Sequence, residues 1–195
     1  SPTNTVSRLL RATSTNDSKR NNVNANINYR YAVTGGTELN IDADYGVFSI
    51  RSKQFQPNDY FDASGTTKLY SNVYRMISPT DIDIFSVKGD YERNFYKGRL
   101  GIGAKVGFVK TDNDFRRYDV IGNTDVYDKD KSNRFKYTEN INALYVNYNR
   151  AFKGFMVQFG LRLENTVSDG NSTGLKYNSN TSLYANYDSS IHRNY

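Results

Sequence analysis

The sequence has no cysteine, no tryptophan and one histidine, His192, and these absences remove whole classes of site. Without cysteine there are no disulfides and no thiolate metal ligands, and one histidine cannot build a multi-histidine metal site or supply a second histidine to a catalytic triad. No run approaches the ~18 apolar residues of a membrane-spanning helix. The polar stretch from Ser1 to Asn22 lacks the apolar segment of a signal peptide. Helical membrane spanning is therefore excluded, and we expect any export signal to lie upstream.

What the sequence does have is polarity combined with many aromatic residues. Mean hydropathy is -0.75, yet the 195 residues include 17 Tyr and 11 Phe, which argues against a disordered chain. The length gives room for one domain. A membrane β-barrel reconciles polarity with order, because each strand spends apolar residues only on its lipid face.

The net charge of +6 indicates affinity for anions, but its distribution does not favour nucleic acid. The 26 Lys and Arg are interleaved with 20 Asp and Glu, whereas nucleic-acid binding needs a clustered basic stripe.

Apolar and polar residues alternate with period two, which predicts antiparallel hairpins with two different faces. Glycine-containing turns at 34–36, 96–98 and 152–154 close three such hairpins. The predicted apolar face carries Val23, Ala25, Ile27, Tyr29, Tyr31, Val33, Leu39, Ile41, Ala43, Tyr45, Val47, Phe85, Val87, Gly89, Tyr91, Leu100, Ile102, Ala104, Val106, Phe108, Phe155, Val157, Phe159, Leu161 and Leu163. In the strand from Ile141 to Tyr148 two sets compete for that face: Ile141, Ala143, Tyr145 and Leu144, Val146, Tyr148. A last strand around Leu183, Ala185 and Tyr187 has no visible partner.

The connections alternate between short and long. The segments between hairpins, Arg51 to Thr80, Asp112 to Tyr137 and Thr166 to Asn180, are long and polar. Transmembrane barrels have short periplasmic turns and long extracellular loops. We therefore predict an all-β fold: about seven antiparallel up-and-down strands that form part of a transmembrane β-barrel and do not close by themselves. On this interpretation residues 1–21 are the end of an earlier external loop.

Two features favour the membrane barrel over a soluble β-sandwich. Asp42, Lys105 and Arg162 fall at strand centres on the polar face, where a wet lumen tolerates charge better than a packed interior. Aromatic residues lie near strand ends on the apolar face, as in an interfacial girdle: Tyr29, Tyr31, Tyr45, Phe108 and Tyr148. A sandwich with one exposed polar face stays open as the alternative.

Several motifs carry a family resemblance over nearly the whole chain. They are Asn24-Ala-Asn-Ile-Asn-Tyr-Arg-Tyr31, Glu38-Leu-Asn-Ile-Asp-Ala-Asp-Tyr-Gly46, Asp90-Tyr-Glu-Arg93, Tyr137-Thr-Glu139 and, most specific, Gly160-Leu-Arg-Leu-Glu-Asn-Thr166. With these the sequence resembles the β-barrel region of TonB-dependent outer-membrane receptors, in particular the Bacteroidetes-type outer-membrane β-barrel family.

The resemblance implies a location in the outer membrane and a barrel of ~22 strands with a plugged lumen. It also implies import of a scarce ligand with energy passed from the inner membrane. The partners would be outer-membrane lipid, the remainder of the barrel and its plug, and the energy-coupling protein through segments not in this chain. We expect residues 1–195 to be one segment of the barrel domain, without plug or signal peptide.

Phe115, Arg116, Arg117 and Tyr118 are the ligand-contact candidates, placed by the pattern in an external loop. Aromatic rings with guanidinium groups can stack on and hydrogen-bond a sugar or another small ligand. The structural alternative is a loop tip that rests on its neighbour.

The segment from Asp128 to Glu139 places Asp128, Asp130, Ser132 and Glu139 at positions 1, 3, 5 and 12 of a calcium-loop pattern. Asn133 stands where glycine usually turns the chain. Lys129, Lys131, Arg134 and Lys136 oppose a cation, so a charged external loop is the competing interpretation.

No arrangement of residues supports an enzyme or a bound cofactor. Gly101 to Lys105 lacks the spacing of a phosphate loop, and Glu38, Asp42 and Asp44 form a charge ladder rather than a catalytic pair. The function hypotheses are the wall and external loops of a transporter or receptor, a soluble β-rich binding or adhesion module, and a structural barrel without transport.

Overall fold

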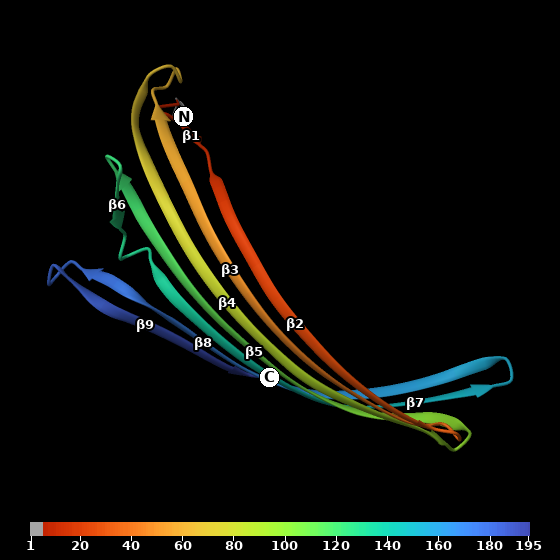
Figure 1. Cartoon of the computed structure of the whole chain (residues 1–195). Coiled ribbons are helices and arrows are strands. Elements are labelled where there is room, and N and C mark those ends of the chain that lie inside the picture. The colour runs from red at the N-terminus through yellow and green to blue at the C-terminus, as the bar shows by residue number, and fades with distance from the viewer. Residues whose placement is uncertain (1–5) are drawn as a thin grey trace, which may run out of the picture.

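The computed structural model describes residues 6–195, which form nine antiparallel strands in one curved sheet (Figure 1). The strands are β1 (Leu9–Ala12), β2 (Thr15–Val33), β3 (Thr37–Phe61), β4 (Lys68–Phe95), β5 (Gly98–Ile121), β6 (Thr124–Tyr127), β7 (Asn133–Phe152), β8 (Phe155–Asn178) and β9 (Leu183–Asn194). The pairing order is β3-β4-β5-β7-β8-β9, with β1 and β2 both on β3 and the short β6 on the end of β5. The all-β, antiparallel, unclosed sheet confirms the predicted fold class.

The three predicted tight turns are present and lie together at one end of the sheet, here called the turn end (Figure 1). Gly36 closes the β2–β3 turn with φ of 90°, a backbone region that glycine reaches without strain. Between β4 and β5 two non-glycine residues, Tyr96 and Lys97, take positive φ values of 44° and 59°. The opposite end, with the longer connections, is called the loop end.

Cross-strand register shows which residues share a face, because residues directly opposite one another point to the same side. Val23 lies opposite Val47 and Ile27 opposite Ala43. The apolar set continues with Tyr45 opposite Phe85 and Phe85 opposite Phe108. We call the face that bears these residues the outer face and the opposite one, with Asp42 and Lys105, the inner face.

Register also settles the strand with two competing apolar sets. On β7, Leu144, Val146 and Tyr148 lie opposite Leu163, Leu161 and Phe159, so they belong to the outer face. Ala143 and Tyr145 therefore belong to the inner face, where Ala143 is only 3% exposed.

The predicted long loops are wrong over most of their length. β3 and β4 pair as far as Phe61 with Lys68, which leaves only residues 62–67 as a connection. Likewise 112–121 belongs to β5, 133–137 to β7 and 166–178 to β8. Residues 1–21, interpreted above as the end of an earlier external loop, are also largely strand: Leu9–Ala12 is β1, and β2 begins at Thr15. Residues 1–5 lie outside the described part. Polar residues on both faces do not prevent pairing, since the backbone ladder and cross-strand ion pairs sustain it.

The last strand does have a partner: β9 pairs with β8 from Asn178 opposite Leu183 to Val167 opposite Asn194. The seven predicted strands correspond to β2–β5 and β7–β9, and within residues 6–195 the structure adds the short β1 and β6.

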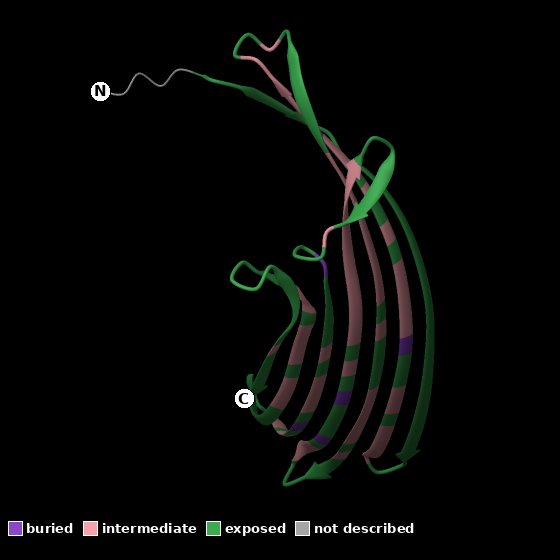
Figure 2. Cartoon of the chain, turned by 90° about the vertical axis from the view of Figure 1, so that its left-hand side faces the viewer, coloured by how far each residue is buried: buried purple, intermediate pink, exposed green. Residues whose placement is uncertain are grey.

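The sheet is a single layer without an interior (Figure 2). Within residues 6–195 the buried hydrophobic core consists of Ala143 alone. In the same part of the chain no helix is long and apolar enough to cross a membrane. Stability must therefore come from the ladder and from whatever covers the faces.

Candidate functional site

The outer face carries an exposed apolar belt next to the turn end. Val23, Ile27 and Leu163 are 71%, 74% and 66% exposed. The belt runs from Val23 to Val33 on β2 and from Phe155 to Leu163 on β8, with Leu39 to Val47, Phe85 to Tyr91, Leu100 to Phe108 and Leu144 to Tyr148 between them. An apolar surface of this extent marks contact with another apolar phase.

The belt is about one membrane thick. The 11 residues from Val23 to Val33 cover ~33 Å along the strand at ~3.3 Å per residue. A strand tilted by ~40° would turn that length into ~25 Å, the height of the apolar band of outer-membrane barrels.

The tilt itself follows from how the belt drifts across the sheet. The middle of the belt is at Asn28 on β2 and at Phe159 on β8. Phe159 lies opposite Tyr148, Tyr148 opposite Leu100, and Leu100 opposite Arg93, and the register of β4 with β3 and of β3 with β2 puts Arg93 level with Val33. The drift is 33 - 28 = 5 residues over five neighbouring strand pairs. With ~3.3 Å per residue and ~4.8 Å between strands, the belt lies at about 35° to the perpendicular of the strands. Transmembrane barrel strands tilt by ~35–45°.

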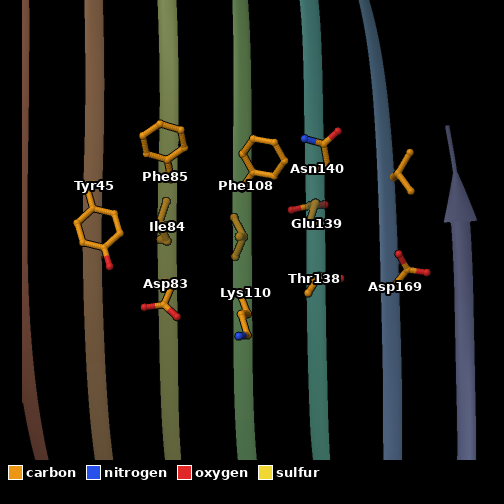
Figure 3. A pocket seen from close by; sticks show the side chains of 12 residues that line it. Tyr45, Asp83, Ile84, Phe85, Phe108, Lys110, Thr138, Glu139, Asn140 and Asp169 are labelled. Atoms are coloured by element: carbon orange, nitrogen blue, oxygen red, sulfur yellow. The ribbon is translucent and has the colours of Figure 1, made fainter.

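Aromatic residues line the loop-end rim of the belt. Tyr45, Phe85 and Phe108 stand side by side on β3, β4 and β5 (Figure 3), and the rings of Phe85 and Phe108 stack at 6.4 Å between centroids. They line a shallow cavity of about 340 Å³ together with Asp83 and Lys110 in the next row. Aromatic rings between an apolar and a charged zone are typical of a membrane–water interface.

Beyond this rim the outer face is charged and ion-paired. Arg51 lies 2.8 Å from Asp81, and Arg134 lies 2.6 Å from Asp112. The hydrogen bond from Arg134 holds the pKa of the Asp112 carboxyl below its usual range. Such pairs fit water rather than lipid, because an ionised side chain in hydrocarbon is costly.

The inner face at belt level is polar. Glu38 lies 2.9 Å from Arg30 and 3.4 Å from Arg99, and Arg99 also lies 2.5 Å from Glu92. Tyr145 extends across Gly103 and donates to Asp90 at 2.5 Å. Of the charges predicted for the polar face, Asp42, Lys105 and Arg162 all lie on the inner face, where Arg162 pairs with Glu164 and Asp42 accepts a hydrogen bond from Asn28.

The four ligand-contact candidates lie in β5, not in a loop, and they divide between the two faces. Arg116 and Tyr118 are on the outer face, where Arg116 pairs with Asp114 at 2.8 Å. Arg117 is on the inner face: its guanidinium sits 4.0 Å from the Tyr74 ring centroid and 3.1 Å from Asp128. Phe115 shares the inner face with Arg117. The structure thus does not gather the four residues, and both guanidinium groups already have partners; ligand contact by them stays a prediction.

The calcium-loop residues are engaged separately. Asp128 pairs with Arg117, the Asp130 carboxylate accepts from the Tyr177 amide at 2.9 Å, and the Ser132 hydroxyl donates to the Asp128 carbonyl at 2.6 Å. Glu139 stands on β7, opposite Val109 and Ser168. Within residues 6–195 no group of three or more acidic or histidine side chains could hold a metal. Calcium binding stays a prediction without a gathered ligand set.

A second set of apolar residues, which alternation alone does not reveal, occupies the inner face toward the loop end. Phe48 lies opposite Ile82 and Ile84 opposite Val109, and further members are Ile50, Phe135, Tyr137 and Ile191. Their signal in the sequence is the apolar doublets Val47-Phe48, Ile84-Phe85 and Phe108-Val109, which break the period of two.

An inner-face cavity of about 440 Å³ lies over β7, β8 and β9. Stacked Phe135 and Tyr137 rings, 6.4 Å apart, form one side. The Tyr137 hydroxyl donates a hydrogen bond to Glu139 at 3.0 Å. The pKa of Tyr137 is raised, mainly by burial and also by this hydrogen bond.

Comparisons with known proteins come from a family model and a solved structure. A model described as outer membrane protein beta-barrel family matches residues 32–189. No curated protein sequence matches the chain. Among solved structures, the chain is similar to the ferric yersiniabactin uptake receptor FyuA from Yersinia pestis, with 11% identity and a TM-score of 0.41. That alignment covers 81% of this chain and 25% of the receptor, so the chain spans a quarter of its length.

Proposed function

The chain belongs to the outer membrane protein beta-barrel family, and from this premise we propose that it is part of the wall of a TonB-dependent receptor that binds and imports a scarce ligand. As a member of that family it is an outer-membrane protein and not an enzyme. The soluble β-module hypothesis is thereby set aside.

The observation that carries the receptor proposal is how far the sheet continues beyond the belt. Lys68 to Asp83 of β4, 83 - 68 + 1 = 16 residues, lie between the rim and the loop end. At ~3.3 Å per residue and a ~35° tilt they extend roughly 40 Å outside the membrane. Because short turns face the periplasm, this extension is extracellular. A barrel that only reinforces the membrane has no need of such a surface, whereas a receptor uses it to meet its ligand.

In this proposal residues 1–195 are one segment of a larger barrel. The paired charges of the inner face line the lumen, and the plug and the energy-coupling contact come from other segments. Membership in the Bacteroidetes-type group of these receptors, which the sequence motifs suggest and most specifically the one from Gly160 to Thr166, is part of the same proposal.

Import can be tested without knowing the ligand. Cells with and without the full-length protein are grown in dilute complex medium, and the medium is followed by mass spectrometry. At least one compound should disappear only when the protein is present, and a protonophore should abolish that difference. If every compound is depleted equally by both strains, the receptor proposal is wrong and a structural barrel is the better interpretation.

A further inference from the structure

The apolar side of the sheet changes from the outer to the inner face at the loop-end rim. Successive residues of a strand point to opposite faces, so each apolar doublet transfers the apolar set to the other side. The doublets Val47-Phe48, Ile84-Phe85 and Phe108-Val109 lie at nearly the same level on three neighbouring strands. Just beyond the rim the outer face carries charges such as Asp81 and Asp112, while the inner face carries apolar residues such as Phe48 and Ile82.

Apolar residues on the inner wall just above the membrane are unexpected for a water-filled passage. Water would favour polar groups on both faces of this extension. The chain instead places exposed Ile191, Phe135 at 39% exposure and half-buried Tyr137 on the inner side. These residues surround the cavity over β7, β8 and β9. The wall is thus suited to contact a solute rather than only to enclose water.

The cavity combines a flat aromatic side with polar groups of every kind. Phe135 and Tyr137 stack with an interplanar angle of 19° and form the β7 side. Small residues of β8, Ser168, Gly170 and Ser172, form the floor, which leaves the volume open. Glu139 provides a carboxylate, and Arg193 on β9 provides a guanidinium that donates to the Tyr195 hydroxyl at 2.9 Å.

We propose that this cavity is a binding site for a saccharide, with one sugar ring resting on the Phe135–Tyr137 pair. A pyranose has an apolar C–H face for the rings and hydroxyl groups that both donate and accept. Glu139 can only accept, Arg193 can only donate, and the serine hydroxyls do both. A ligand with a net charge would be attracted by one of Glu139 and Arg193 and repelled by the other, whereas a neutral polyhydroxyl ring can hydrogen-bond to both. The volume of about 440 Å³ lies within the ~300–1,000 Å³ of small-ligand sites.

The site rests on the proposed receptor function and gives it a ligand class. It lies on the inner face just beyond the loop-end rim of the belt, with Tyr137 at the level of Thr111 and Ile82. It is distinct from the Phe115–Tyr118 candidates, whose two arginines are held by Asp114 and Asp128.

The test is binding of the purified full-length protein, in detergent micelles, to an array of neutral oligosaccharides. At least one glycan should bind, and titration of that glycan should show Tyr137→Ala and Glu139→Gln weakening affinity by about tenfold, the scale of one lost stacking or hydrogen-bonding contact. Lys136→Ala is the matched control, because Lys136 is next to Tyr137 in the sequence but its side chain lies on the outer face. The affinity of this variant for the glycan should stay within about twofold of the unmodified protein.

Two results would overturn the saccharide site: no glycan binds, or the inner-face variants bind as tightly as the Lys136 variant. The depletion experiment separates these from failure of import. If a compound other than a saccharide is taken up only with the protein, the receptor function stands and the ligand class is wrong. If nothing is taken up, the function itself fails. Folding of each variant is checked by its heat-dependent mobility on gels.

Discussion

Gly103 and Tyr145 show how single residues position the inner wall. Tyr145 lies across the Gly103 position on the neighbouring strand, so that a Cβ there would overlap the phenol ring. This close approach lets the Tyr145 hydroxyl reach Asp90 two strands away. At the level of one side chain, the glycine is needed for space rather than for an unusual backbone angle.

Gly103→Ala is therefore expected to destabilise the barrel, by about 1–3 kcal/mol, because the new methyl group displaces the ring. Gly89→Ala is the matched control, since a Cβ at Gly89 meets nothing within 4 Å. The control should be neutral or stabilising by up to ~1 kcal/mol, as glycine is costly in a strand. Urea unfolding of the full-length protein in lipid vesicles measures both, and equal effects would contradict the close-approach argument.

At the level of the element, each long strand has two consecutive parts with different surroundings. The part next to the turn end presents apolar residues outward, whereas just beyond the rim the strands present charges outward and apolar residues inward. β7 shows this division: Leu144 is 64% exposed on the outer face, while Tyr137 faces inward. The apolar doublets lie at the boundary between these two parts. The interruption of the period-two alternation in a strand therefore indicates where the strand leaves the membrane.

The absence of tryptophan allows a direct test on β7. Single tryptophans at 143–148 in the full-length protein should be quenched by brominated lipid at 144, 146 and 148 but not at 143 and 145. Lipid-facing side chains touch the brominated acyl chains, and inner-face side chains do not. Tryptophans at 135 and 137 should escape quenching because they lie inward and beyond the rim. Quenching at 143 and 145 instead would mean that the register between β7 and β8 is wrong.

At the level of the whole molecule, the sheet is asymmetric between its two ends. On β2 the belt reaches the last residue before the turn, Val33, whereas on β4 residues 68–83 extend beyond the belt toward the loop end.

This asymmetry predicts the orientation in the cell, and the lack of cysteine makes labelling simple. A cysteine at Ser64, in the 62–67 connection, should react with a membrane-impermeant maleimide in intact cells. A cysteine at Lys153, in the β7–β8 turn, should react only after the outer membrane is opened. The reverse pattern would place the extension in the periplasm and remove the basis for a ligand site there.

Local pattern alone determined the fold class, the three tight turns and the outer face of β2 to β5 and β8. Period-two alternation and glycine turns act between residues close in sequence, so they can be read without knowing the partners. The same pattern failed at the long connections, where polar residues on both sides resemble a loop until a neighbouring strand is present to pair with them.

Only the tertiary structure decided the face of β7, the partner of β9 and the inner cavity. Each depends on register between strands: Leu144 becomes outer because it lies opposite Leu163, and Phe135, Gly170 and Ile191 become neighbours because β7, β8 and β9 pair in one order. The same register separated Arg116 from Arg117, which adjacency in the sequence had joined. Alternation fixes which residues of one strand share a face, but pairing across strands decides what each face can bind.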